Sequence, residues 1–228
     1  MARAHEVLGG RWTLLIVREI LFGTRRFNDI RRAIPRISRT VLSERLKSLA
    51  FAGAIERVDG AEAQEYILTP AGHELAALVR DFGIWGQRWL TREPAKEDID
   101  LDPVLIDMQR RVSFDSLPKD PFVVRFEIKG HRPRFMLMKK TEASICHQNL
   151  GFPELVCIRG PLAALVGWWR GDTSFNGAQR IGLEVEAPRA LNRAFPTWFE
   201  LYAFADVEPA SRIANENAHP VKAAARSR

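Results

Sequence analysis

The chain has 228 residues, of which 46% are hydrophobic and 27% are charged, and its formal net charge is +6. This composition is ordinary for a globular protein, and the length fits one large domain or two small ones. No apolar run reaches the length of a membrane span, and the opening residues lack the apolar stretch of a signal peptide. These features argue against insertion in a membrane or secretion and predict a cytoplasmic protein. Two cysteines, Cys146 and Cys157, are too few for a disulfide framework, so we interpret them as small core residues.

Short amphipathic helices, separated by glycine or proline, follow one another at the start of the chain. Gly9 and Gly10 end the first helix and Gly23 ends the second. Pro35 ends the third, because the residue before a proline is pushed out of the helical region. The apolar spacing predicts these helices over residues 2–8, 12–22 and 27–34, and a fourth from its N-cap Ser38 to about residue 52.

The fourth helix has an apolar and a polar side. At about 100° per residue, one side carries Leu42, Leu46 and Leu49. The opposite side is polar and would face a DNA groove: Thr40, Glu44 and Lys47, flanked by Arg39 and Ser43. Arg45 flanks the apolar side, where a structural role is the simpler interpretation.

Positive charge is concentrated in the same region. Between Arg18 and Lys47 the sequence has nine basic and three acidic residues, so this segment accounts for the net charge of the whole chain. A phosphate backbone favours such a cluster through counterion release and electrostatic steering. The alternative is an ordinary solvated helix surface, but the cluster coincides with the helix pattern, and together they favour DNA binding.

Two short strands are predicted next, over residues 54–58 and 65–68, joined by a polar turn. A strand–turn–strand unit directly after the fourth helix has the layout of the wing of a winged helix. Its only predicted DNA contact is Arg57, which is outnumbered by Asp59, Glu62 and Glu65, so we expect the wing to add little affinity.

A long helix is predicted from Thr69-Pro70, an N-cap followed by proline at the first helical position, to about residue 92. It carries a broad apolar stripe of Leu75, Leu78, Val79, Phe82, Trp85 and Trp89. Because large aromatic patches are seldom left in water, we expect the stripe to form the seam of a dimer.

The second half of the chain follows an acidic segment without apolar periodicity, residues 93–101, which we interpret as a linker. Alternation of apolar and charged residues from Val124 to Lys129 predicts a half-buried strand. The remaining elements are helices over 103–111, 161–169 and 188–195 and strands over 134–139, 143–147, 155–159 and 181–186. Residues 205–228 have no core pattern and predict a disordered tail.

Aromatic residues are frequent enough in this half to line an apolar pocket. The candidates are Phe126, Phe135, Leu137, Trp168, Trp169, Phe175 and Phe195, and for any one of them an ordinary core position is the alternative. The five histidines lack metal-ligand spacing, and no catalytic triad, phosphate-binding glycine loop or carboxylate pair is recognisable. We therefore expect no metal, no cofactor and no enzymatic activity.

The first ninety or so residues resemble the HxlR family of winged helix-turn-helix transcription regulators. The matching residues are Leu8-Gly9-Gly10-Arg11-Trp12-Thr13, Phe27, Ile37-Ser38, Val41-Leu42-Ser43-Glu44-Arg45-Leu46, Tyr66-Ile67-Leu68-Thr69-Pro70-Ala71-Gly72 and Trp85-Gly86-Gln87-Arg88-Trp89. The resemblance implies a homodimer, in which the first and last helices of the domain exchange contacts, and a palindromic operator. Family members often have a cysteine just ahead of the first helix. This sequence has none there, so either its start is truncated or it does not sense through a thiol.

The second half looks like a reduced sterol-carrier-protein domain. The similar residues are Leu155-Val156-Cys157-Ile158-Arg159-Gly160-Pro161, Gly171-Asp172 and Ile181-Gly182-Leu183-Glu184-Val185-Glu186-Ala187. In that fold a strand leads into a helix, a later short strand closes a sheet, and sheet and helices enclose an apolar tunnel.

The sequence thus predicts an α+β protein with four parts. Residues 1–92 form a winged helix-turn-helix domain for DNA binding and dimerisation, 93–101 a linker, 102–204 a small sterol-carrier-like α+β domain that binds a ligand, and 205–228 a disordered tail. The predicted function is regulation of transcription by a homodimer that binds double-stranded DNA and is controlled by an apolar small molecule. The alternative is a lipid or acyl carrier, or an interaction module, with a vestigial winged helix.

The predicted DNA contacts have two roles. Arg39, Thr40, Ser43 and Lys47 would read bases, because arginine can bind guanine through two hydrogen bonds. The others would contact phosphates or cap the helix, positioning the protein without specifying sequence: Arg25, Arg26, Arg36, Ser38 and Arg57.

Overall fold

The structure is a computed structural model that describes residues 1–60, 63–90, 100–118 and 120–210. The chain divides into two compact units, Met1–Gly86 and Gln87–Arg228, which we call the N-terminal unit and the C-terminal unit. Most of the predicted linker, and the predicted tail beyond residue 210, lie outside the described residues.

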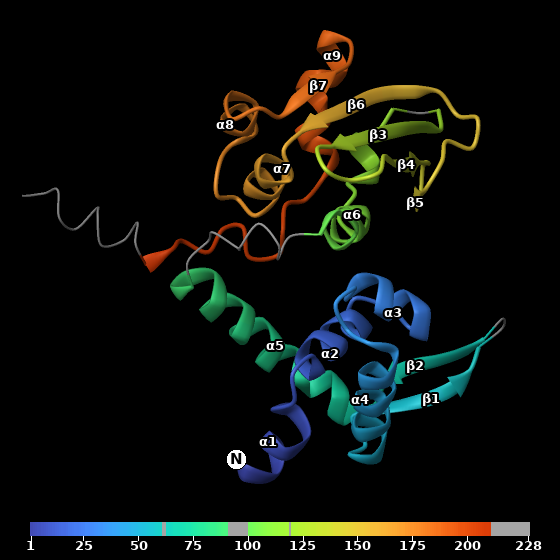
Figure 1. Cartoon of the computed structure of the whole chain (residues 1–228), viewed down its shortest axis with the longest axis vertical. Coiled ribbons are helices and arrows are strands. Elements are labelled where there is room, and N and C mark those ends of the chain that lie inside the picture. Colours follow the sequence, from blue (N-terminus) through green and yellow to red (C-terminus); the bar gives the residue numbers. More distant parts are fainter. Residues whose placement is uncertain (61–62, 91–99, 119, 211–228) are drawn as a thin grey trace, which may run out of the picture. The chain divides into compact units, whose positions relative to one another are not determined.

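The N-terminal unit has the predicted order of helices and strands, with boundaries that differ by at most three residues (Figure 1). Its elements are α1 (Ala2–Leu8), α2 (Thr13–Leu21), α3 (Phe27–Ala33), α4 (Arg39–Phe51), β1 (Ile55–Asp59), β2 (Gln64–Leu68) and α5 (Pro70–Trp89), whose last three residues continue past the boundary at Gly86. Buried apolar residues from α2, α3, α4, β1 and β2 form one core, with Ile16, Val17, Ile30, Leu42 and Leu49 all fully buried. Three helices followed by a hairpin on a common core confirm the winged helix-turn-helix fold.

The hairpin β1–β2 is antiparallel, with Ile55 opposite Leu68 and Asp59 opposite Gln64. The segment before α3 pairs with its second strand, because the backbone N–H of Tyr66 donates to the carbonyl of Arg25 at 2.8 Å. The wing is therefore joined to the helices through backbone hydrogen bonds as well as through the core.

Close packing at the start of α5 explains one glycine of the family motif. The Thr69 hydroxyl donates to the carbonyl of Gly53 at 2.6 Å and accepts from the backbone N–H of Gly72 at 3.1 Å, so Thr69 is the predicted N-cap. A Cβ atom at Gly72 would lie 1.9 Å from the carbonyl oxygen of Ala54. Only glycine allows α5 to approach the residue before β1 this closely.

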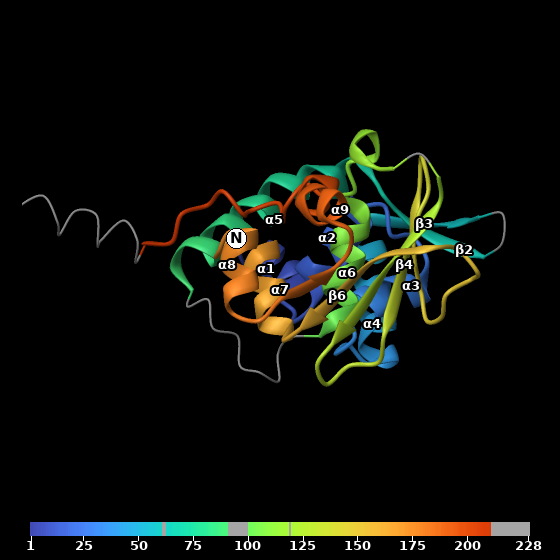
Figure 2. The same ribbon diagram turned by 90° about the horizontal axis from the view of Figure 1, so that it is seen from above.

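The C-terminal unit is a mixed sheet with helices. Its elements are α6 (Leu101–Arg110), η2 (Phe114–Ser116), β3 (Phe122–Ile128), β4 (Arg134–Met138), β5 (Ala143–Cys146), β6 (Glu154–Gly160), α7 (Leu162–Trp169), α8 (Phe175–Arg180), β7 (Glu184–Glu186), α9 (Arg189–Ala194) and η3 (Phe195–Trp198). The strand order is β5-β4-β3-β6-β7, and β3 and β6 are parallel while the other pairs are antiparallel (Figures 1 and 2). Together with the N-terminal unit, this sheet makes the chain a mixed helical and strand protein.

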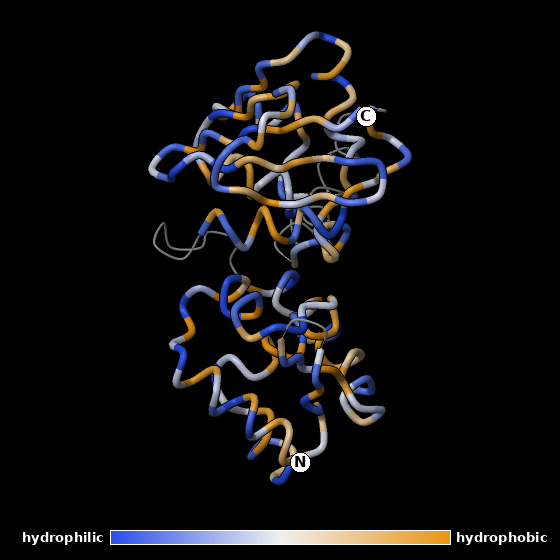
Figure 3. Tube along the Cα trace, turned by 90° about the vertical axis from the view of Figure 1, so that its right-hand side faces the viewer, coloured by the Kyte–Doolittle hydropathy of each residue, from blue (hydrophilic) through white to orange (hydrophobic). Residues whose placement is uncertain are grey.

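The two faces of this sheet differ. One face packs against α6 and α7 and contains the buried side chains of Val124, Phe126 and Met136; hydrophobic segments concentrate along these strands in Figure 3. The strand register places Arg125 beside Phe135 and Cys157, and Glu127 beside Arg159, on the other face, which we call the outer face.

Two predictions for this half need correction. The predicted strand over 181–186 begins only at Glu184, because Ile181 and Gly182 form the turn that ends α8, with Gly182 at a φ of +103°. The six-residue helix α8, capped by the Ser174 hydroxyl, which accepts from Gly177 N–H at 3.1 Å, was not predicted. In addition, the described chain continues past residue 205, where the predicted tail begins, and the backbone N–H of Ala205 donates to the carbonyl of Tyr202 at 2.8 Å.

Candidate nucleic-acid interface

Helix α4 is positioned by its apolar side and by its N-cap. Leu42, Leu46 and Leu49 are at most 1% exposed. The Ser38 hydroxyl accepts from the backbone N–H of Val41 at 3.2 Å, which satisfies one of the unpaired N–H groups at the helix start. The leucines prevent rotation of the helix about its axis, so its opposite side has a defined direction.

That opposite side is polar and open to solvent. Arg39, Thr40, Glu44 and Lys47 are exposed, and Ser43 is half-buried. The structure thus brings all four predicted base-reading residues onto one helix. Within the described residues, neither Arg39 nor Lys47 forms an ion pair. Two unpaired cations beside two hydroxyls fit the chemistry of a phosphate backbone and of base edges.

The other predicted contacts lie elsewhere in the unit. Arg25 and Arg26 precede α3, and their guanidinium groups lie 3.8 Å and 3.7 Å from the carboxylate of Glu65 on β2. Arg36 lies exposed between α3 and α4, and Arg57 is exposed on β1 opposite Tyr66. The two arginines beside Glu65 are thus held against β2 near the turn of the wing, a pairing that no local sequence pattern indicates.

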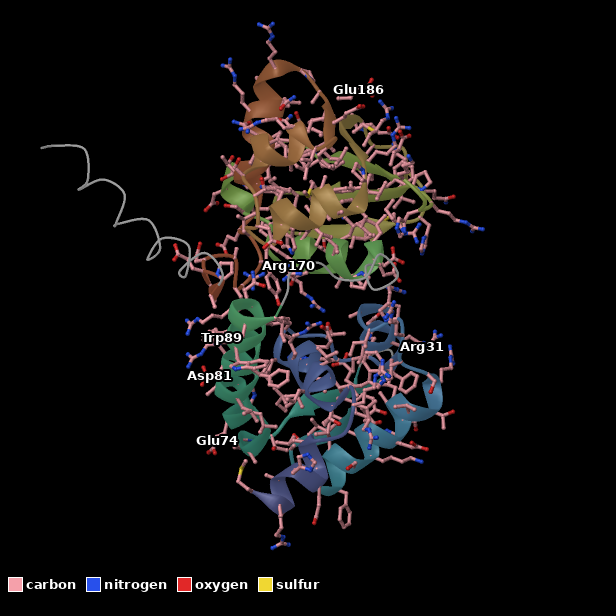
Figure 4. The ribbon with its side chains drawn as sticks, turned by 60° about the vertical axis from the view of Figure 1, so that its left-hand side comes forward. Arg31, Glu74, Asp81, Trp89, Arg170 and Glu186 are labelled. Carbon is pink, nitrogen blue, oxygen red and sulfur yellow. The ribbon has the colours of Figure 1, made fainter. Side chains whose placement is uncertain are left out.

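Helix α3 adds cations that we did not assign to the interface. Arg31 is exposed on this helix (Figure 4), and Arg32 lies 3.4 Å from Asp29 one turn earlier. Both belong to the basic segment noted in the sequence, and that excess of charge is the signal by which they could have been included.

Helix α5 exposes a row of large apolar side chains. The predicted stripe is divided: Leu75 and Val79 pack against the core of the N-terminal unit. The remaining residues, which we call the α5 stripe, are 45–62% exposed and consist of Leu78, Phe82, Trp85 and Trp89; Figure 4 labels Trp89 near one end of the helix and Glu74 near the other. Spacings of three and four residues put them on one side of the helix.

The predicted ligand residues of the C-terminal unit lie on both faces of its sheet. Phe126, Trp168 and Phe195 are buried in one core, together with Trp169 and the partly buried Phe175. Phe135 and Leu137 lie on the outer face, so the seven residues do not line a single pocket. A depression of about 510 Å³ is lined by other residues: Gly171, Asp172, Thr173, Ser174, Leu201, Ala205 and Asp206.

The outer face carries a network of ion pairs. Arg125 lies 3.1 Å from Glu127 and 3.2 Å from Glu154, and Arg159 bridges Glu127 and Glu186, which Figure 4 labels. The hydrogen bond from Arg159 lowers the pKa of the Glu127 carboxyl.

Burial acts in the opposite direction on the thiol in this network. It raises the pKa of the buried Cys157 thiol. Within the described part of the chain, no group of three or more His, Cys, Asp or Glu side chains is placed to hold a metal ion. No helix among those residues is long and apolar enough to cross a membrane.

Comparison with known proteins agrees with this geometry. Residues 7–94 match the family described as HxlR-like helix-turn-helix. YvaP of Bacillus subtilis, an uncharacterized HTH-type transcriptional regulator, is 38% identical over 91 residues, which cover 39% of this chain and 84% of YvaP. Rv3095 of Mycobacterium tuberculosis, of the same description, is 43% identical over 95 residues, 40% of this chain and 60% of that protein. The chain thus spans about three fifths of the mycobacterial relative.

A solved structure also aligns with the chain. The reduced form of the transcriptional regulator YodB from B. subtilis has 33% sequence identity and a TM-score of 0.37, over 41% of this chain and 95% of that one.

The chain belongs to the HxlR-like helix-turn-helix family. The relatives that match it are named as transcriptional regulators rather than as enzymes.

Proposed function

We propose that the protein is a sequence-specific DNA-binding transcription regulator that acts as a homodimer. The observation that carries this proposal is the orientation of α4, whose buried leucines leave Arg39 and Lys47 exposed without ion partners among the described residues. Arg39 and Lys47, with Thr40 and Ser43, enter the major groove, and cations around α3 and beside the start of β2 contact phosphates.

The α5 stripe is the proposed dimer seam. Its four side chains are more than two fifths exposed, and aromatic residues contribute strongly to protein interfaces. In a symmetric dimer each α4 reads one half-site, and the two half-sites lie about 34–36 Å apart, one turn of DNA. This arrangement requires a palindromic operator.

Selection of duplexes from a random-sequence pool by the full-length protein tests the assignment. We expect a palindrome to be enriched, and the logarithm of its binding constant to fall steeply and linearly with the logarithm of salt concentration. A protein that enriches no sequence, or whose binding is independent of salt, is not the proposed regulator.

We further propose that residues 102–204 of the C-terminal unit, the predicted domain after the linker, bind an apolar small molecule that controls the regulator. One feature supports a sterol-carrier-like domain, and a second supports a bound ligand. Strand β6 leads into α7 and the later short strand β7 joins the sheet beside β6, which is the order that the resemblance implies. The buried indole N–H of Trp198 has no hydrogen-bond acceptor among the described residues, so a bound carbonyl group would satisfy it.

Native mass spectrometry of the protein as purified tests this second proposal. A co-purified lipid that is displaced by a fluorescent fatty acid, with a change in affinity for the selected palindrome, would support it. A protein that binds the fatty acid but no duplex is the lipid or acyl carrier considered as the alternative. One that binds neither is an interaction module.

A further inference from the structure

The junction between α1 and α2, residues 9–12, lies against Arg45 of α4. A Cβ atom at Gly10 would lie 2.9 Å from Cζ and 3.1 Å from Nε of Arg45. The guanidinium group therefore occupies the space that any larger residue at Gly10 would need. Its Nε is buried and has no hydrogen-bond partner among the described residues.

Arg45 points away from the proposed groove-reading side of its helix. At about 100° per residue, it lies next to Leu42 and Leu49 and on the far side of the helix from Thr40 and Lys47. An arginine whose guanidinium group packs on a glycine backbone beside the core is badly placed to read a base. Its contact is with the α1–α2 junction.

The junction itself is held in a strained conformation. Trp12 has a φ of +79°, a conformation that is unfavourable for a residue with a side chain and persists only where surrounding contacts impose it. The guanidinium carbon of Arg11 lies 4.6 Å from the centre of the Trp12 ring. Helix α1 has no buried residue of its own, and its partly buried Val7 and Leu8 pack on the core just before the junction.

We propose that Arg45 is a positioning residue that fixes α4 relative to the α1–α2 junction. If α1 shifts, for example when a second copy of the chain binds it, the contact between Gly10 and Arg45 would shift the DNA-reading helix α4 as well. This inference rests on the proposed function, because it concerns how that function's reading helix is held.

A double-mutant cycle of Gly10→Ala and Arg45→Ala tests the coupling. The φ of Gly10 is not in the left-handed region, so alanine fits its backbone and acts by displacing the guanidinium group. We expect Gly10→Ala to weaken binding to the selected palindrome about fivefold in the natural chain but less than about twofold when Arg45 is already alanine. Equal losses in the two backgrounds would overturn the proposal.

The salt dependence of binding separates positioning from direct contact. Arg45→Ala should lower affinity without changing the slope of log affinity against log salt, whereas loss of a phosphate contact reduces that slope by about one. Arg45→Lys, which keeps the charge and the aliphatic stem, should recover at least half of the loss on the logarithmic scale and covers the case in which Arg45→Ala does not fold. A reduced slope, or a lowered unfolding temperature with unchanged DNA affinity, overturns the proposal.

Thermal unfolding of the same four proteins distinguishes failure of the proposed regulator from failure of the proposed positioning role of Arg45. If the unfolding midpoints are non-additive but the protein binds no duplex, the contact between Gly10 and Arg45 exists. The protein is then not the proposed regulator, and Arg45 has no positioning role in DNA binding. Additive midpoints in a protein that does bind its palindrome would overturn the inference alone.

Discussion

The two units differ in how their cationic and aromatic side chains are paired and buried. In the N-terminal unit, Arg39 and Lys47 have no ion partner among the described residues, and Phe82 and Trp85 are more than half exposed. In the C-terminal unit, the arginines of the outer face and the aromatic rings of the core have internal partners. Arg159 bridges two carboxylates. The aromatic rings of this unit pack on one another, with centroid distances of 5.0 Å between Trp168 and Phe175 and 5.5 Å between Phe195 and Trp198. Groups without internal partners mark the surface where we expect external ones.

The largest expected effect is on the free energy of unfolding, when one phenylalanine in each unit is replaced by alanine. Phe195→Ala removes a ring with no exposed surface and should lower the free energy of unfolding of the C-terminal unit by about 3–5 kcal/mol. Phe82→Ala, at 62% exposure, should change that of the N-terminal unit by no more than about 0.5 kcal/mol at concentrations where the chain is a monomer. Chemical denaturation followed by tryptophan fluorescence measures both, and comparable losses would contradict the contrast.

The next largest effect is expected from removing cations of the two units and comparing the loss of DNA affinity. Arg39→Ala with Lys47→Ala should weaken binding to the selected palindrome about 100-fold or more, because a base contact and a charge are both lost. The control carries the same charge change on exposed residues of the C-terminal unit, Lys129→Ala with Arg132→Ala, and should lower affinity no more than about threefold. Fluorescence anisotropy at fixed salt compares them. Equal losses would mean that only net charge matters.

A smaller effect is expected at the α5 stripe. Trp85→Ala should weaken self-association about tenfold, because aromatic residues dominate the energetics of most interfaces. Sedimentation velocity over a range of concentrations measures it, with exposed Ile181→Ala of the C-terminal unit as the control. If the natural chain stays monomeric, or if the Trp85→Ala protein dimerises equally well, the α5 stripe is not the dimer interface.

The smallest effect concerns the outer face. Because the folded state lowers the pKa of Glu127, this carboxylate stabilises the C-terminal unit above its unfolded pKa, and the contribution is lost as pH falls through its folded pKa. Glu127→Gln should be slightly less stable at neutral pH and should flatten the acid limb of a stability–pH curve. An acid limb that is identical in the two proteins would show that Arg159 pairs with Glu127 too weakly to matter.

The sequence indicated most of the N-terminal unit because its signals are local. The spacing of Leu42, Leu46 and Leu49 sets the buried side of α4, and Ser38 and Thr69 cap the helices that they precede. The division of the α5 stripe was not predictable in the same way, since helical spacing does not tell which apolar residues a small core covers.

The missed features of the C-terminal unit depend on tertiary structure. Alternation along β4 separates Phe135 from Met136, but only the pairing of β3 with β4 decides which of them shares a face with Phe126. The short helix α8 contains Gly177, a poor helix former, and the fold supplies what the local sequence lacks. The pairing of Arg25 and Arg26 with Glu65 likewise joins residues that are distant in the sequence.

The parallel pairing of β3 with β6 has a consequence for synthesis on the ribosome. The hairpins β3–β4 and β4–β5 close as they emerge, but the inner edge of β3 has no partner until residues 154–160 have left the exit tunnel. An open strand edge in a nascent chain invites pairing with other chains. The N-terminal unit is complete long before that moment, so it would already be folded while β3, the central strand of the second sheet, still lacks β6.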